Sequence, residues 1–286
     1  MQILRDRFHW YFLFFLALTA GLVWHVIAVE DRAGKLTVAF LDVGQGDAIF
    51  IESPTGTQMM IDGGPGSMVL RELGQVMPFY DRSIDLLLVS NPDTDHMSGF
   101  LDVLRSFDVS AVVEPGTVGA SSDYRSFLEE VEKEKASHVI AQRGQRFELG
   151  GGVYFEILFP DREVSGLETN HGSIIGRLVY GDTSFLFPGD APSAVEEYVA
   201  YLDKERLDVD VLKVGHHGSK TSTGDVFLGF ASPAMAIISA GKENRYGHPH
   251  PEVIDRLKQF NVQTLGTYER GRVIVESDGD TVRIKK

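Results

Sequence analysis

The sequence contains no cysteine. This absence excludes disulfides, zinc ribbons and a thiol nucleophile, so any metal must be held by histidine, carboxylate, asparagine or backbone groups. Basic residues are also outnumbered, because 27 Lys and Arg stand against 41 Asp and Glu, for a formal net charge of −14. Such an acidic chain repels nucleic acid over most of its surface. A nucleic-acid substrate would need a local basic patch, for which the candidates are Lys213, Lys220, Lys242 and Arg245; the alternative is that these are scattered, solvated side chains.

Long apolar runs are missing except near the amino terminus. Residues 10–29 are apolar apart from Thr19 and His25. At about 1.5 Å of helical rise per residue, a run of this length roughly matches the hydrocarbon core of a bilayer. Tryptophans near both ends of the run suit the two membrane interfaces. The sequence therefore predicts one transmembrane helix at residues 10–29.

The charges around this run predict its orientation. Arg5 and Arg7 precede it, whereas the charges that follow it cancel. The positive-inside rule then places the amino terminus in the cytoplasm and the rest of the chain outside the cell membrane. We expect a cytoplasmic tip, anchor and linker in residues 1–35 and one domain in residues 36–286. The alternative is a cleaved signal peptide, with residues 26–28 as its small-residue cleavage site, which would make the protein secreted.

One stretch brings together several side chains that bind metals. Residues 84–89 form a short apolar run, typical of a buried strand. A proline follows Asn91 and favours an extended conformation there, so Asn91 and Asp93 project to the same side. Asp95 and His96 come next, at the start of a predicted helix that runs to about residue 107. Open α/β sheets bind ligands at such strand ends, although a strand-to-helix turn with capping residues is the alternative.

Further polar groups follow later strands. Asp190 comes after an apolar strand predicted at residues 183–187, and His216 and His217 come after one at residues 209–213. His248 and His250 lie in a Gly-His-Pro-His-Pro segment; we favour His248 as a substrate contact, and the alternative is a loop that leads into a helix.

The order of elements predicts an α/β (α+β) fold. No segment of 20 to 50 residues repeats. The two halves nevertheless share an order of hairpin strands, helix, strand, helix and strand. We expect two facing sheets with helices outside, a four-layer αββα sandwich. Asp95 and Asp190 would then meet at one edge of that sandwich.

Six motifs in this order resemble the metallo-β-lactamase superfamily, and most closely the hydrolase domain of the bacterial DNA-uptake protein ComEC. They are residues 40–48 (FLDVGQGDA), 61–64 (IDGG), 95–96 (DH), 187–190 (FPGD), 212–219 (LKVGHHGS) and 244–251 (NRYGHPHP). The resemblance covers about residues 36–285. It implies an αββα fold with one or two divalent metals, Zn or Mn, between the two halves.

The resemblance also implies roles for single residues. Asp95 and His96 match ligands of the second metal, Asp190 matches a bridging carboxylate, and either His216 or His217 matches the late histidine ligand. Asp42 and Asp62 lie after strands and beside glycines. We favour a role as supports of the ligand loop, and the alternative is that they form turns.

The first metal site departs from the signature HxHxDH. Asp93 stands at the second histidine position, as is common in ComEC-like members, and Asn91 replaces the first histidine. His171, in the segment Asn170-His171-Gly172-Ser173, is either a further ligand or incidental. An oxygen-rich first site favours manganese or magnesium over zinc.

Carboxylates and imidazoles together suit a metal ion that activates water for attack on phosphorus or a carbonyl. We therefore expect a membrane-anchored metallo-hydrolase that cleaves phosphodiesters, DNA included, with Asp95, Asp190 and His248 as catalytic residues. Its substrate would be a nucleic acid or another anionic molecule. One alternative is a weak or inactive member that binds without turnover, because Asn91 replaces a ligand. Another is hydrolysis of a small ester or lactam. The sequence does not identify a protein partner.

Overall fold

The computed structural model describes residues 2–30, 32 and 34–285, in two compact units, Met1–Gly34 and Lys35–Lys286. Helix α1 (Gln2–Glu30) makes up most of the described part of the first unit. Across the described residues, no helix meets the length and apolarity needed to cross a membrane. Part of the predicted span, including the side chains of residues 25–29, lies outside the described residues. The predicted location of the second unit outside the cell stays a prediction.

Within the described residues, the second unit contains an eight-stranded mixed sheet, ordered β15-β14-β1-β2-β3-β4-β5-β6. The strands from β15 to β3 are antiparallel, and those from β3 to β6 are parallel. Their bounds are β1 (Leu36–Phe40), β2 (Ala48–Glu52), β3 (Gln58–Gly63), β4 (Ser83–Leu88), β5 (Asp108–Glu114), β6 (Ser137–Ile140), β14 (Val273–Ser277) and β15 (Val282–Ile284).

The described part of this unit also contains a seven-stranded sheet, ordered β13-β12-β11-β10-β9-β8-β7. It is antiparallel from β7 to β10 and parallel from β10 to β13. Its strands are β7 (Arg146–Gly150), β8 (Val153–Phe159), β9 (Ile175–Tyr180), β10 (Thr183–Phe187), β11 (Val211–Lys213), β12 (Met235–Ile238) and β13 (Gln263–Gly266).

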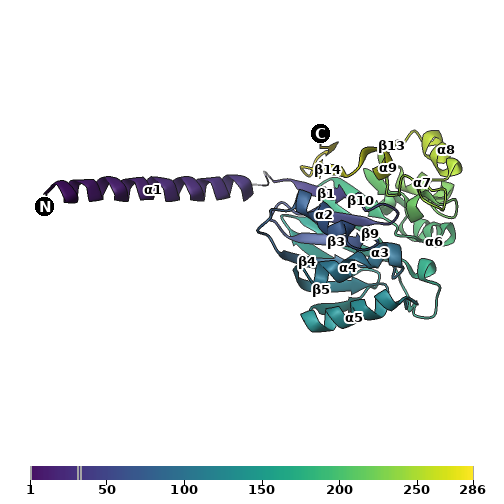
Figure 1. Ribbon diagram of the computed structural model, residues 1–286. Coiled ribbons are helices and arrows are strands. Elements are labelled where there is room, and N and C mark those ends of the chain that lie inside the picture. Colours follow the sequence, from purple (N-terminus) through teal and green to yellow (C-terminus); the bar gives the residue numbers. More distant parts are fainter. Residues whose placement is uncertain (1, 31, 33, 286) are drawn as a thin grey trace. The chain divides into compact units, whose positions relative to one another are not determined.

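Helices cover the outer faces of the two sheets (Figure 1). The first sheet carries α2 (Met68–Val76), α3 (Thr94–Met97), α4 (Gly99–Leu104) and α5 (Ser122–Glu134). The second carries α6 (Ser193–Asp203), α7 (Asp225–Ala231) and α8 (Pro251–Gln259), and the short helix α9 (Thr267–Arg270) follows β13. Single 3₁₀ turns lie at η1 (Thr169–Gly172), η2 (Lys204–Leu207) and η3 (Gly215–Gly218).

Alternation along the strands produces these layers. In β1, Val38 and Phe40 belong to the apolar cluster between the sheets, whereas Ala39 packs in the cluster under the outer helices. Successive side chains of a strand point to opposite faces, so an all-apolar strand can serve both clusters. Phe40 of the first sheet stacks on Phe187 of the second, with ring centroids 6.3 Å apart. The structure thus has the predicted α/β architecture of two facing sheets with helices outside.

The helix expected after β4 differs from the prediction. It is divided into α3 and α4 at Ser98 and Gly99. The reason is a close approach between backbones, because a Cβ on Gly99 would lie 2.0 Å from the carbonyl oxygen of Gly63. Backbone hydrogen bonds from Gly64 N to His96 O (3.0 Å) and from Gly99 N to Gly64 O (2.8 Å) fix this contact. The glycine loop after β3 therefore holds the loop that carries His96.

Candidate metal centre

Three loops at the carboxyl ends of strands supply the centre. Asp93 precedes α3 in an extended conformation, and α3 itself carries Asp95 and His96. Asp190 follows β10 and is 3% exposed.

His216 and His217 follow β11, and both have left-handed backbones, with φ of 47° and 55°. Such conformations are strained for residues other than glycine and persist where the surrounding structure holds them. Gly215 and Gly218 flank the pair, and the tight turn directs both rings toward Asp190.

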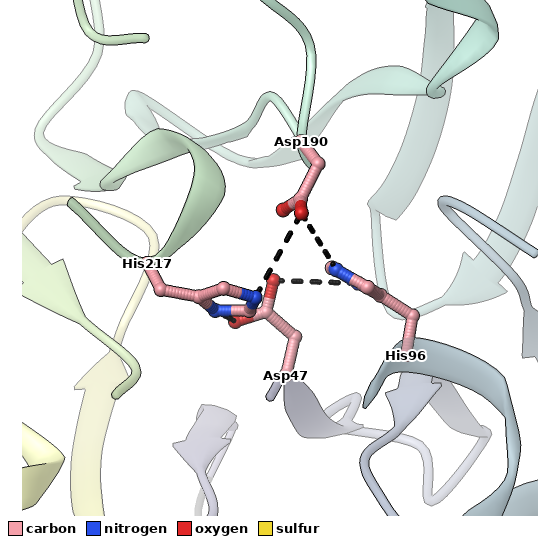
Figure 2. Close-up of side chains that lie close together, drawn as sticks. All are labelled: Asp47, His96, Asp190 and His217. Carbon is pink, nitrogen blue, oxygen red and sulfur yellow. Dashed lines mark ion pairs between the residues drawn. The ribbon is translucent and has the colours of Figure 1, made fainter. Parts of the chain in front are cut away.

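Two buried imidazoles lie between two buried carboxylates at the centre of the site. Figure 2 shows His96 and His217 between Asp190 on one side and Asp47 on the other. His96 Nε2 is 3.0 Å and His217 Nε2 is 3.8 Å from Asp190 Oδ2. Asp95 Oδ2 lies 3.4 Å from His217 Nε2. The Nε2 atoms of His96 and His217 therefore lie close to the carboxylates of Asp190 and Asp95 in one small volume.

The hydrogen bonds on the far side of each ring determine its tautomer. His217 Nδ1 is 3.1 Å from the carbonyl oxygen of Ser239, which can only accept, so Nδ1 carries the proton. His96 Nδ1 is 2.8 Å from Asp62 Oδ2 and donates to it. The Nε2 atoms of neutral His96 and His217 are consequently acceptors.

These acceptors face another acceptor, the Asp190 carboxylate. Among the described residues, His96 Nε2, His217 Nε2 and Asp190 Oδ1 have no hydrogen-bond partner. Acceptors that converge in a buried site require a cation between them. Two imidazoles with carboxylates are a donor set that zinc and manganese accept, so the residues present fit a divalent ion.

The pKa values of the buried histidines and of Asp190 also indicate that the site favours positive charge. Burial alone would lower the pKa of His96, but Asp190 and Asp62 outweigh it and hold that pKa well above its ordinary value. Burial likewise opposes the effect of Asp47 and Asp190 on His217, whose pKa is nevertheless raised to about 9. The pKa of Asp190 is well below its ordinary value, because the neighbouring histidines outweigh burial. Without a metal, protons supply the missing charge.

The centre opens into a cavity of about 190 Å³. Burial lowers the pKa of His216, whose Nε2 lies 3.4 Å from Asp190 Oδ2, and burial raises the pKa of Asp93. Both residues line the cavity, and burial disfavours the charged form of each. The lining residues are Gln45, Asp93, Asp95, Asp190, His216, His217, Tyr246 and His248.

His248 lies at the cavity wall, as the sequence predicted for a substrate contact. Its ring centroid is 5.7 Å from that of His216 and 5.7 Å from that of Tyr246. Burial, together with the charges of the neighbouring histidines, lowers the pKa of His248 to about 4. The ring is therefore neutral at pH 7 and can act through hydrogen bonds but not through charge.

Asn91 is engaged by the protein itself. Its side chain is fully buried, and its amide nitrogen donates to Asn170 Oδ1 at 2.6 Å. Its Oδ1 accepts from the backbone N of Asp93 at 3.0 Å. The structure therefore occupies both polar ends of the Asn91 amide, and its role as a ligand stays a prediction.

His171 lies outside the cluster. Its side chain is 50% exposed, and its Nδ1 is 3.3 Å from Glu168 Oε2. His171 is not found among the described residues that line the cavity. Of the two interpretations of this residue, the structure favours the incidental one.

Two supports of the ligand loop were expected. Asp62 acts as one: besides His96, it accepts hydrogen bonds from Ser90 N at 2.7 Å and from Ser90 Oγ at 2.6 Å. Asp42 instead accepts from Gly44 N at 3.3 Å, within its own turn.

Sequence reasoning missed Asp47 and misread Lys213. Asp47 lies in the motif of residues 40–48 but was given no role, yet it belongs to the cluster and is 1% exposed. Lys213 was considered for a surface basic patch, and that expectation is wrong, because it is 1% exposed and forms an ion pair with Asp47. A lysine at the end of an apolar buried strand was the available signal, since such a charge requires a buried partner.

Comparisons with known proteins agree with this geometry. The family described as "Metallo-beta-lactamase superfamily" matches residues 41–242. ComE operon protein 3 of Bacillus subtilis is 31% identical over 254 residues, which are 82% of this chain and 32% of that protein. Recombination protein 2 of Haemophilus influenzae is 31% identical over 253 residues, 86% of this chain and 29% of that protein. The chain thus spans about a third of the length of these relatives.

A solved structure gives the same fold. The metallo-β-lactamase fold protein YhfI from Bacillus subtilis superposes with a TM-score of 0.56 at 12% identity, covering 85% of this chain and 100% of that one.

Proposed function

This chain belongs to the metallo-β-lactamase superfamily, and we propose that it is a metal-dependent hydrolase that cleaves phosphodiesters. The observation that carries the proposal is the convergence of His96 Nε2, His217 Nε2 and the Asp190 carboxylate with no donor between them. These three groups and Asp95 would hold one divalent ion. Such an ion lowers the pKa of water toward about 7 and stabilises negative charge that develops on phosphoryl oxygens.

The protein's own residues orient the reaction. The pKa of Asp95 is lowered: burial opposes this, but the neighbouring His217 and His96 outweigh it. Asp95 is therefore ionised, and its side chain is 34% exposed, so it can accept a hydrogen bond from an attacking water. Neutral His248 faces the same cavity and can bond to an oxygen of the substrate.

A second cavity of about 500 Å³ adjoins the first, and its lining includes the acidic residues Asp95 and Glu243 and one cation, Arg245. The two cavities share Gln45, Asp95 and Tyr246. Arg245 is the only Lys or Arg among the described residues that line either cavity. Its guanidinium carbon lies 4.9 Å from the centroid of the Tyr246 ring, and Tyr246 is 48% exposed. A cation beside an exposed aromatic ring suits a phosphate that carries a planar group.

Nucleic acid is the phosphodiester that we favour. One relative is named for recombination, which supports this choice. The remaining acidic surface then confines binding to the cavity that contains Arg245, and raised salt should weaken that binding.

The test is a substrate panel on the purified full-length chain. After chelation and dialysis, Mn²⁺ or Zn²⁺ is added back, and hydrolysis of bis(p-nitrophenyl) phosphate, a labelled oligonucleotide and nitrocefin is measured. We expect metal-dependent cleavage of the first two and none of nitrocefin. Hydrolysis of nitrocefin alone would overturn the proposal in favour of a lactamase.

A second candidate is a binding protein without turnover. The engaged amide of Asn91 favours it, because this residue stands where the resemblance implies a histidine ligand. A chain that binds metal and oligonucleotide but cleaves no substrate of the panel would establish this candidate instead.

A further inference from the structure

A buried ion pair lies under the two imidazoles, on the side opposite Asp190. Asp47 and Lys213 are each 1% exposed, and Lys213 Nζ contacts Asp47 Oδ2. Asp47 immediately precedes β2 in the first sheet, and Lys213 ends β11 in the second. The pair therefore joins the two halves of the fold directly beneath the candidate metal centre.

Asp47 faces the protonated side of both rings. Its Oδ1 lies 3.3 Å from His217 Nδ1, and its Oδ2 lies 3.6 Å from His96 Nδ1. Figure 2 shows the two rings converging on Asp47 on this side. Because the free Nε2 atoms point to Asp190 instead, Asp47 does not share their ligand position. One carboxylate thus contacts both histidines at the atoms that a metal would leave free.

The backbone fixes Asp47 to the loop of His96. Asp47 N donates to the carbonyl oxygen of Asp95 at 3.2 Å. The preceding Gly46 has a φ of 143°, and a Cβ there would lie 2.2 Å from that same oxygen, so only glycine permits the approach. Lys213 is followed closely by the tight turn that carries His217. Each member of the pair is therefore attached to one of the two histidine loops.

We propose that Asp47 and Lys213 are positioning residues that hold His96 and His217 with both Nε2 atoms directed at one metal ion. This inference rests on the metal site of the proposed function but not on its substrate. Carboxylates that hydrogen-bond to metal-bound histidines fix the tautomer and orientation of the ring. Asp62 and the Ser239 carbonyl accept the Nδ1 protons of His96 and His217, and the Asp47 carboxylate places its negative charge 3.6 and 3.3 Å from the same two atoms. Lys213 compensates for burying that charge.

The test compares Asp47→Asn and Lys213→Met with a matched control, Asp203→Asn. Asp203 is another buried carboxylate in an ion pair, with Arg143 at 2.7 Å, and is not among the described residues that line either cavity. Affinity for Mn²⁺ and Zn²⁺ is measured by competition with a chromophoric chelator, and the visible spectrum of the Co²⁺-loaded protein reports ligand geometry.

We expect each variant of the pair to bind metal about 10- to 100-fold more weakly, the loss typical of a partner behind a metal ligand. The Co²⁺ spectrum should change in both. Asp203→Asn should lose thermal stability but keep the wild-type affinity and spectrum. If a single variant does not fold, the double variant, which leaves no unpaired buried charge, should show the same loss.

The outcomes separate this inference from the proposed function. Wild-type affinity and spectrum in folded Asp47→Asn or in the double variant would overturn the role of the pair. A loss in Asp47→Asn without one in Lys213→Met would remove Lys213 from it. A wild-type chain that binds neither metal would overturn the proposed function itself.

Discussion

Replacing Asp190 with asparagine keeps the shape of the side chain and removes its charge. Asp190 Oδ2 lies 3.0, 3.4 and 3.8 Å from the Nε2 atoms of His96, His216 and His217. Loss of a group behind a metal ligand weakens binding about 10- to 100-fold, so loss of a ligand charge should weaken it by about 100-fold or more. That factor corresponds to about 2.8 kcal/mol of binding free energy.

Chelator competition measures this change, with circular dichroism as the check of folding. Asp182→Asn, which alters an exposed aspartate outside both cavities, is the matched control and should bind metal as wild type does. Affinity within threefold of wild type in folded Asp190→Asn would refute the reasoning, because a carboxylate that contacts three imidazoles would then contribute nothing to the site.

Of four further predictions, two concern protons, one a departure in the sequence and one a buried acid. The pKa of His217 is about 9 because neighbouring carboxylates outweigh burial, so its proton must leave when a metal binds. Loss of this proton alone should raise metal affinity about tenfold from pH 7 to pH 8 in calorimetry; a flat profile contradicts this. In the metal-free protein, protonated His217 stabilises the fold, because its pKa is raised on folding. This stabilisation is fully present below about pH 6.5 and is lost as pH rises through about 9, so the melting temperature should fall over that window. Asn91→His should increase zinc per chain, measured by mass spectrometry, and unchanged stoichiometry with the fold intact argues against a ligand position. Glu196→Ala leaves the buried backbone N–H groups of Thr223 and Gly224 without their acceptor, and should cost about 1–3 kcal/mol in denaturant unfolding; a change below about 0.5 kcal/mol contradicts this.

Local patterns in the sequence were sufficient to predict much of this site. Three polar segments each follow a strand: the loop that begins at Asn91, the Gly-Asp pair at residue 190 and the paired histidines. The structure brings Asp190 and His217 together with His96. Strand ends are readable because apolar runs and glycine turns act over a few residues. Six such motifs in order also predicted the two-sheet architecture.

Contacts between distant segments could not be read in the same way. Asp47 and Lys213 are 166 residues apart, and Asn91 and its partner Asn170 are 79 apart. A local pattern assigns such residues to turns, caps or the surface, because it contains nothing about the partner. Strand β14 is another example, because its pairing with β1 joins segments from the two ends of the domain and depends on the folded sheet.

The central claim is that His96, His217 and Asp190 bind one metal ion together. A crystal of the full-length chain soaked in Mn²⁺, with anomalous scattering measured at the metal edge, tests it most directly. We predict one strong peak within bonding distance of His96 Nε2, His217 Nε2 and an Asp190 oxygen, with Asp47 on the opposite side of the rings. A peak bonded to Asp47 in place of Asp190, or no peak at this centre in a crystal saturated with Mn²⁺, would contradict it.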